Sequence, residues 1–208
     1  MTSIGSAKTE ARQTVLIVED DLATGEALCD LLDSAGVPAL RFASAEEFIE
    51  AWDPSTAGCL VLDARLPGMS GIELQARLVE SGIKVPIIVI TAHGDVPMAR
   101  KALKTGAVEF LTKPFQDEEF FLAVAQAFAF DRETRKANKI SESIRARVDS
   151  LSNRERQVVK LVTSGLTNRE IADQLCLQVV TVKLYRRLAM KKMGVDTLAD
   201  LVKLWEKR

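Results

Sequence analysis

The chain has 208 residues, enough for one large domain or two small ones, and 47% of them are hydrophobic, as in globular proteins. No apolar run approaches the roughly 18 residues of a membrane span and the N-terminus lacks the hydrophobic segment of a secretion signal, so we expect a cytoplasmic protein without a membrane partner. The cysteines form no C-x-x-C pair, which argues against disulfides and zinc and predicts reduced thiols packed in the core: Cys29, Cys59 and Cys176.

The net charge of −1 conceals an asymmetry between the two parts of the chain. Residues 1–130 carry 10 Lys and Arg against 19 Asp and Glu, a net charge of −9, whereas residues 131–208 carry 18 against 10, a net charge of +8. A small basic domain is typical of nucleic-acid binding, and an acidic one with carboxylates at strand ends suggests a cation site. We therefore expect the two parts to have different partners.

Short apolar runs alternate with amphipathic stretches in the first part of the chain. The runs predict strands, and they cover residues 14–18, 38–42, 59–62, 86–91 and 108–111. Serines open two of the stretches between them with the spacing of a capping box, Ser44 with Glu47 and Ser70 with Glu73. This alternation predicts an α/β fold, a doubly wound parallel (βα)5 sheet with helices on both faces.

The second part of the chain reads as helix throughout. From Asp131 to about Val148 it is charged and free of Pro and Gly, which predicts a helical linker that continues the fifth helix. Beyond Leu151 two capping boxes open helices, and a third helix is expected over about 179–193, stopped by a glycine. The brief turn CLQV between the second and third of these helices predicts a helix-turn-helix in an all-α domain.

Polar residues follow the apolar runs of the predicted sheet. They are Glu19, Asp20 and Asp21 after the first run, Asp63 after the third, Thr91 after the fourth and Lys113 just beyond the fifth. Because the carboxyl ends of parallel strands meet at one edge, these side chains should share a crevice, where crowded carboxylates and oxygen-only ligands suit Mg²⁺. Such a metal beside an aspartate, a lysine and a hydroxyl suits the acceptance of a phosphoryl group, with Asp63 as metal ligand and nucleophile.

Four motifs in this order and spacing, LIVEDD, VLDARLPGMSG, VITAHGD and FLTKPF, resemble the receiver domain of bacterial two-component response regulators over about residues 13–130. The resemblance implies that a histidine kinase phosphorylates Asp63. It also implies that Mg²⁺ is held by Glu19, Asp20, Asp63 and the backbone carbonyl of Arg65. HGDVPMA further resembles the FixJ-like branch of this family.

The same resemblance assigns roles on the last two strands. Thr91 and Lys113 would bind the phosphoryl group, Thr91 and Phe110 would form the switch, and the Lys113–Pro114 peptide bond would be cis. Arg65 and His93 occupy the positions that tune dephosphorylation in receivers.

Other interpretations of the acidic strand ends stay open. Asp21 alone is readable as a helix cap, and Phe110 as simple core. A phosphohydrolase with an aspartyl-phosphate intermediate usually carries a second Asp two residues beyond the nucleophile, where this chain has Arg65, and no P-loop motif favours an ATPase. An interaction module that works without phosphorylation is the third alternative.

The helix expected over 179–193 is the most basic element of the chain. Its apolar residues Val180, Leu184, Leu188 and, less regularly, Met193 predict an inner stripe. Its basic residues fall on other faces, and they are Lys183, Arg186, Arg187, Lys191 and Lys192. Basic side chains early in such a helix can reach base edges in the major groove and later ones can meet phosphates, although a basic face is often merely solvated.

The segment LSNRERQVVKLVTSGLTNREIADQL followed by TVKLYRRLAMKKMGV resembles the LuxR-type helix-turn-helix over residues 151–208. By this resemblance Lys183, Leu184 and Arg187 stand at base-contacting positions. Two residues depart from the family pattern: Gln178 stands where the helix cap is usually Ser, and Tyr185 where the family usually has His. These departures bear on operator preference rather than on DNA binding itself.

Together the two resemblances imply a transcription regulator of the NarL/FixJ type rather than an enzyme, apart from its own phosphoryl transfer and dephosphorylation. Phosphorylation would favour a homodimer that binds double-stranded DNA sequence-specifically; the cognate histidine kinase and RNA polymerase are further expected partners. The expected domains are a flexible tail over 1–12, the receiver over 13–130, the helical linker over 131–150 and the DNA-binding domain over 151–208.

Overall fold

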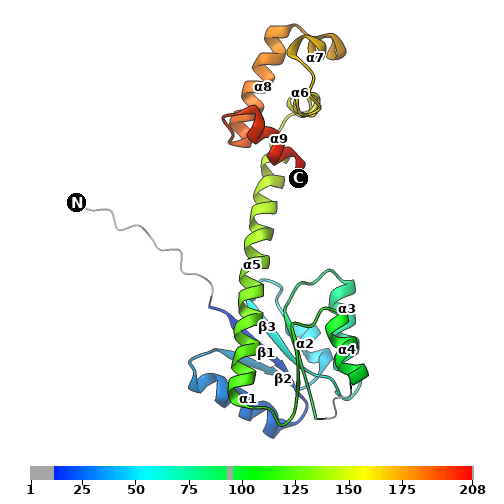
Figure 1. Ribbon diagram of the computed structural model, residues 1–208, viewed down its shortest axis with the longest axis vertical. Helices are drawn as coiled ribbons and strands as arrows, with labels where there is room; N and C mark the ends of the chain where they lie inside the picture. Colours follow the sequence, from blue (N-terminus) through cyan, green and yellow to red (C-terminus); the bar gives the residue numbers. More distant parts are fainter. Residues whose placement is uncertain (1–11, 93–95, 208) are drawn as a thin grey trace, which may run out of the picture. The chain divides into compact units, whose positions relative to one another are not determined.

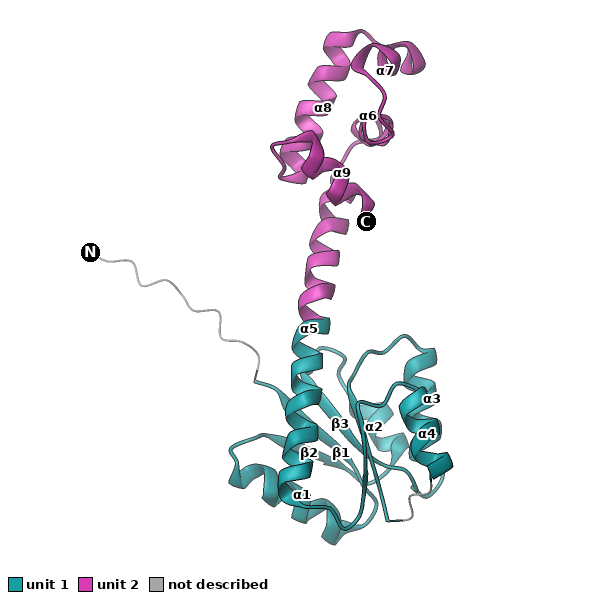
Figure 2. Ribbon diagram, viewed as in Figure 1, with its two compact units in different colours: residues 1–134 teal, residues 135–208 magenta. Residues whose placement is uncertain are grey.

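The computed structural model describes residues 12–92 and 96–207, and the chain divides into two compact units, residues 1–134 and 135–208 (Figure 2). The expected tail up to residue 11 and His93 lie outside the described residues. The expected domain limits remain a prediction, because the unit boundary falls inside a helix that the two units share.

Unit 1 is built on a five-stranded parallel sheet with the strand order β2–β1–β3–β4–β5 (Figure 1). The strands are β1 (Thr14–Val18), β2 (Ala39–Phe42), β3 (Gly58–Asp63), β4 (Ile87–Thr91) and β5 (Glu109–Thr112). Each lies within one residue of its predicted apolar run, so the α/β fold class is confirmed. The carboxyl ends of β1, β3, β4 and β5 share one edge of the sheet.

Helices cover both faces of this sheet because successive strand residues point to opposite sides. Val15 and Ile17 of β1 pack with α1 (Leu22–Ser34) and the first turns of α5 (Asp117–Asp149). Leu16 and Val18 pack on the other face. The helices of that face are α2 (Ala45–Ala51), α3 (Gly71–Glu80) and α4 (Val96–Lys104).

Unit 2 contains the remainder of α5 and four further helices around one apolar core. These are α6 (Asn153–Thr163), α7 (Asn168–Leu175), α8 (Val179–Met193) and α9 (Leu198–Glu206). The expected capping boxes are complete at α6 and α7, whereas Ser44 and Ser70 cap α2 and α3 through their hydroxyls alone. The prediction that the linker continues the fifth helix is confirmed, since α5 is a single element.

The cysteine prediction was wrong at one position. Cys59 is fully buried and Cys29 is half-buried, but Cys176 is exposed in the turn between α7 and α8, where its backbone is left-handed with φ 51°. Cys176 ends α7 in the left-handed conformation common at helix C-termini, so it belongs to the turn and not to the buried face of α7. Within the described part of the chain, no helix has the length and apolar character needed to cross a bilayer.

Gly58 at the start of β3 has no room for a side chain. Its φ is +141°, and a Cβ there would lie 1.8 Å from the backbone oxygen of Thr14 on β1. We predict that Gly58→Ala lowers the free energy of unfolding by at least ~2 kcal/mol, because both the backbone strain and the clash must be relieved. Urea denaturation followed by circular dichroism measures this loss.

Gly82 is the matched control, because its φ is +72° and a Cβ there meets no atom within 4 Å. Gly82→Ala should cost only the left-handed strain, about 1–2 kcal/mol. Equal losses for the two variants would show that the contact with Thr14 contributes nothing.

Candidate functional site

The carboxyl ends of three strands bring a lysine and two carboxylates into direct contact. The ammonium Nζ of Lys113, after β5, lies 2.6 Å from Oε2 of Glu19 and 2.6 Å from Oδ2 of Asp63. Glu19 follows β1 and Asp63 ends β3, and the two residues are 2% and 7% exposed. The structure therefore joins three of the residues that the sequence placed at this edge, in a pocket largely closed to water.

The second oxygen of Asp63 is held by its own loop. Oδ1 accepts a hydrogen bond from the backbone N–H of Arg65 at 2.7 Å, and the backbone of Ala64 is bonded in turn to Ile90 of β4. The start of α3 lies directly against the backbone of Asp63. Only a glycine fits there, since a Cβ at Gly71 would lie 1.9 Å from the Asp63 carbonyl oxygen. Both carboxylate oxygens thus have fixed partners, which orients the group.

Arg41 on β2 holds the backbone of Glu19, and the sequence did not indicate this contact. Its guanidinium Nη1 donates to the backbone oxygen of Glu19 at 3.0 Å. The side chain lies against Gly25 of α1, where a Cβ would come within 2.4 Å of the Arg41 Cδ. Gly25 lies in the amphipathic stretch after the first apolar run, and a glycine in such a stretch can mark a close approach of a neighbouring group, which was the available signal.

The remaining acidic residues after β1 have different surroundings. Asp20 is exposed, whereas Asp21 is the N-cap of α1 and accepts from the Thr24 N–H at 2.8 Å, which confirms the interpretation of Asp21 as a cap. Hydrogen bonds from the Thr24 side chain and then from its backbone N–H hold the pKa of Asp21 below its usual value. Asp21 is therefore committed to the helix start.

The contacts in the pocket shift the pKa of two groups. Burial raises the pKa of Glu19, since loss of water penalises the carboxylate more than the Lys113 ammonium compensates it. Burial acts to lower the pKa of Lys113, but its hydrogen bonds to Asp63 and Glu19 outweigh this effect and raise it. The pocket therefore holds more negative charge than its single ammonium neutralises.

The predicted magnesium ligands fit a divalent cation in their chemistry. Glu19, Asp20 and Asp63 offer only carboxylate oxygens, the donors that Mg²⁺ prefers. Over residues 12–92 and 96–207, however, no three His, Cys, Asp or Glu side chains converge as a ready metal cage. The ammonium of Lys113 lies between two of the expected ligands instead.

Thr91 and Phe110, the expected switch residues, lie on the neighbouring strands. Thr91 ends β4 and is 1% exposed. Phe110 on β5 is half-buried against the apolar core that underlies α2, α3 and α4. The peptide bond between Lys113 and Pro114 is cis. Their roles as a switch remain predictions.

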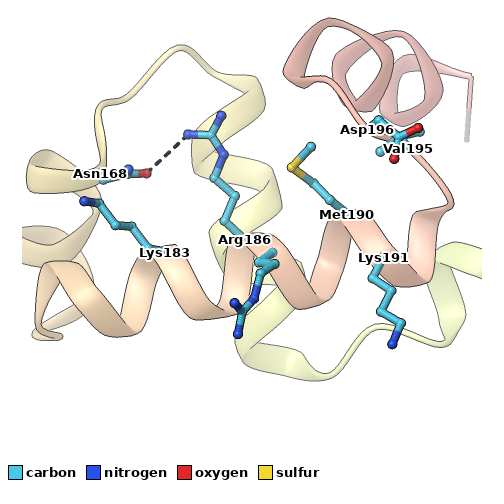
Figure 3. A pocket seen from close by; sticks show the side chains of 8 residues that line it. Asn168, Lys183, Arg186, Met190, Lys191, Val195 and Asp196 are labelled. Carbon is cyan, nitrogen blue, oxygen red and sulfur yellow. Dashed lines mark hydrogen bonds between the residues drawn. The ribbon is translucent and has the colours of Figure 1, made fainter.

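A second candidate surface lies on α8, where basic side chains border a cavity of about 490 Å³ (Figure 3). Its lining includes all four basic residues expected to bind DNA: Lys183, Arg186, Arg187 and Lys191. Three of these are exposed, whereas Arg186 is half-buried and its Nη1 donates to Asn168 Oδ1 of α7 at 3.4 Å. Figure 3 shows Lys183 and Arg186 on the side of α8 that faces α7.

The predicted inner stripe of α8 was mostly wrong. Val180 and Leu184 are 67% and 43% exposed, and Leu188 is exposed as well. Met193 is buried as predicted, and the other buried residues of α8 are Val182 and Ala189, with Tyr185 half-buried beside them. Both sets recur at helical spacing, so periodicity alone could not choose between them.

The exposed set has its own surface. Val180, Leu184 and Arg187 line a second cavity of about 400 Å³ with Thr181 and Lys183, so Leu184 is accessible at its expected contact position. Gln178 provides no side-chain hydrogen bond as the N-cap of α8, in agreement with its departure from the usual serine.

Lys192 does not belong to the basic surface with which the sequence grouped it. Its ammonium lies 2.7 Å from Oε2 of Glu155, the buried carboxylate of the α6 capping box. The backbone N–H of Ser152 donates to the same oxygen at 2.7 Å. Together these bonds hold the pKa of Glu155 below its usual value although burial opposes them.

Comparisons with known proteins cover both parts of the chain. A family model for the response regulator receiver domain matches residues 15–125, and one for bacterial regulatory proteins of the luxR family matches residues 149–205. Nodulation protein W of Bradyrhizobium diazoefficiens is 43% identical, with 97% of this chain and 89% of that protein covered. The transcriptional regulatory protein FixJ of the same organism is 40% identical, with 91% and 93% covered.

Solved structures of response regulators also resemble this chain. The response regulator StyR has a TM-score of 0.86 and 44% identity, with 95% of this chain and all of that chain covered. Full-length FixJ from B. japonicum has a TM-score of 0.58 and 38% identity over 95% of this chain. The buried Asp63–Lys113–Glu19 contact lies in the first matched region and the basic helix α8 in the second. The chain belongs to the two-component response regulators that join a receiver to a LuxR-type helix-turn-helix DNA-binding domain, a family of transcription factors rather than conventional enzymes.

Proposed function

We propose that this response regulator accepts a phosphoryl group from a histidine kinase on Asp63 and then binds DNA as a dimer to regulate transcription. The observation that carries this proposal is the contact of the Lys113 ammonium with Asp63 and Glu19 in one buried pocket. A carboxylate that is buried, oriented and beside a cation suits a nucleophile that must stabilise incoming phosphoryl charge.

The phosphoryl transfer follows from the bonds that hold Asp63. A carboxylate oxygen forms the new P–O bond as the bond from phosphorus to the kinase histidine nitrogen breaks, and the freed imidazole leaves with that electron pair. Lys113 neutralises the phosphoryl oxygens, and the Arg65 N–H keeps the carboxylate turned toward them. The hydroxyl of Thr91 provides a further donor at the end of β4.

Mg²⁺, which receiver domains generally use for phosphorylation, fits the oxygen-only donors of this pocket. In the proposal Glu19, Asp20, Asp63 and the backbone carbonyl of Arg65 hold it, and when bound it supplies positive charge against the phosphoryl oxygens. The excess negative charge of the pocket supports this assignment, since burial already penalises the ionised form of Glu19.

Dimerisation in this proposal uses the surface of α4, β5 and the receiver part of α5. The phosphoryl group draws Thr91 and Lys113 inward, which leaves space for Phe110 to turn toward the core. Three exposed apolar side chains on this surface support its use as an interface: Val96, Leu103 and Leu122. Burial of such side chains in a homodimer removes apolar area from water.

DNA binding in this proposal uses the exposed side chains of α8. Lys183, Leu184 and Arg187 contact base edges, and Arg186 and Lys191 contact phosphates or support those that do. The name of FixJ, a transcriptional regulatory protein, supports regulation of transcription and with it RNA polymerase as a partner and the cytoplasm as the location.

The charge balance of the pocket generates a pH-dependent prediction. Because the pKa of Glu19 is raised on folding, ionised Glu19 disfavours the folded state above that pKa, and this penalty vanishes below the unfolded value of 4.5. Glu19→Gln should therefore raise the free energy of unfolding at pH 7 and leave it unchanged near pH 3.

Denaturation in urea at both pH values measures the effect, and Glu50→Gln, which removes an exposed carboxylate of α2, is the control. A Glu19→Gln variant that is less stable than wild type at pH 7 would contradict the assigned direction.

Asp63→Asn tests the phosphoacceptor. The amide cannot attack phosphorus, so the variant should keep its fold and basal DNA affinity but lose the slow Phos-tag band, the dimer and the gain in DNA affinity produced by a small acyl phosphate with Mg²⁺. Phos-tag electrophoresis, light scattering and gel shifts follow the three effects. Asp33→Asn, on the exposed side of α1, should respond as wild type does. A phosphodonor response of Asp63→Asn equal to that of wild type would exclude Asp63 as the acceptor.

Lys183→Ala and Arg187→Ala test the recognition helix. Each should weaken binding by about 1–3 kcal/mol in a sequence-dependent manner if the side chain reads bases, whereas Lys191→Ala should weaken binding uniformly and lower the salt slope by about 1. Gel shifts on two operators at two salt concentrations separate these outcomes. Wild-type affinity in both the Lys183 and the Arg187 variant would overturn the placement of the recognition surface.

A further inference from the structure

The C-terminal ends of α5 and α8 are each satisfied by a cation from the other helix. Lys192 of α8 donates through Nζ to the backbone oxygen of Ser150, just beyond α5, at 3.2 Å. Arg147 of α5 donates through Nη1 to the backbone oxygen of Met193, the last residue of α8, at 3.1 Å. The last carbonyls of a helix lack intrahelical partners and carry the negative end of its dipole, so each cation stabilises the end that it reaches.

Three further contacts belong to this joint, which Arg147, Ser150, Lys192 and Met193 form. Gly194 ends α8 with φ 65°, and a Cβ there would lie only 3.2 Å from Nη1 of Arg147, so the guanidinium lies close over the helix end. Lys192 also pairs with Glu155, whose carboxylate caps α6, so the start of α6 is bound into the same joint. Arg156 of α6 adds a bond to the backbone oxygen of Val148 at 3.0 Å.

Two adjacent lysines of α8 have different surroundings. Lys191 lines the basic cavity of α8, whereas Lys192, the next residue, directs its ammonium to Glu155 and Ser150. A lysine with these partners contributes little to phosphate binding. Its contacts connect the last turn of the linker helix to the last turn of the recognition helix.

We propose that Arg147 and Lys192 are positioning residues that fix the direction of α8 relative to the last turns of α5, and thereby set the half-site spacing that a phosphorylated dimer can bridge. The inference rests on the proposed function, since it concerns a dimer that binds two half-sites. Once one subunit of the dimer has bound its half-site, the second subunit binds the same duplex intramolecularly. The strength of this second step depends on how closely the α8 of the second subunit is held at its half-site.

The test uses the full-length phosphorylated protein and a duplex that the wild type selects from a random pool. Arg147→Met and Lys192→Met are compared with wild type on that duplex cut to one half-site, on the duplex intact, and with one to five base pairs inserted between the half-sites. Both variants should bind one half-site within about two-fold of wild type, lose about ten-fold on the intact duplex and discriminate less between spacings.

Neighbouring cations provide the matched controls. Arg145→Met, which removes the same charge two residues earlier on α5, should keep the wild-type spacing profile. Lys191→Met should weaken binding to the intact duplex by the square of the factor that it costs on one half-site, because both subunits lose the contact. A loss on the intact duplex no greater than the square of the half-site loss in the Arg147 and Lys192 variants, or wild-type spacing profiles, would overturn the proposal. Failure of wild type to select any DNA would instead refute the proposed function.

A double variant separates positioning from stability. Lys192→Met leaves the buried Glu155 carboxylate without its cation, and Glu155→Gln added to it removes that unpaired charge. The double variant should regain thermal stability while its spacing discrimination stays weak. Recovery of both together would show that the joint acts only through stability, and would overturn the proposal.

Discussion

The contact of one ammonium with two buried carboxylates is the interaction on which the receiver depends. Lys113, Glu19 and Asp63 come from three strands, so their contact requires the parallel sheet to bring those strand ends to one edge. The charges do not balance, because a single cation faces two anions where little water can screen them. A group that is held by an unbalanced contact responds strongly when charge is added, and a phosphoryl group adds a charge close to −2.

The proposed switch needs a free-energy difference that is set by the populations of its two states. A change from 1:99 to 99:1 between two states needs about 5.5 kcal/mol of differential stabilisation. Unit 2 contains a comparable ion pair between Lys192 and Glu155. There the Glu155 carboxylate also caps the start of α6. Asp63 of the receiver caps no helix: its oxygens accept from the Arg65 N–H and from the Lys113 ammonium. The same two residue types therefore stabilise a helix start in unit 2, whereas in unit 1 they form the pocket of the proposed phosphoryl transfer.

The sequence predicted elements and strand ends well because both follow from local patterns. Apolar runs located all five strands, and Asp63 and Lys113 could be assigned to one edge from the rule for parallel sheets alone. The buried face of α8 could not be chosen, because Val180 with Leu184 and Val182 with Ala189 fit a helical period equally, and only the position of α6 and α7 decides which set is covered. The contacts of Arg41 and Lys192 could not be predicted either, because their partners, the Glu19 carbonyl and the Glu155 carboxylate, are distant in the chain.

The close fit of Gly25 beneath Arg41 has a consequence for how this family can vary. Any side chain at position 25 would displace the arginine stem, and with it the bond that holds the Glu19 carbonyl. A shorter residue at position 41 would leave space over the helix but forfeit that bond. The two positions are therefore sterically coupled: a side chain on α1 here requires a replacement on β2, and we expect the pair to covary across homologues.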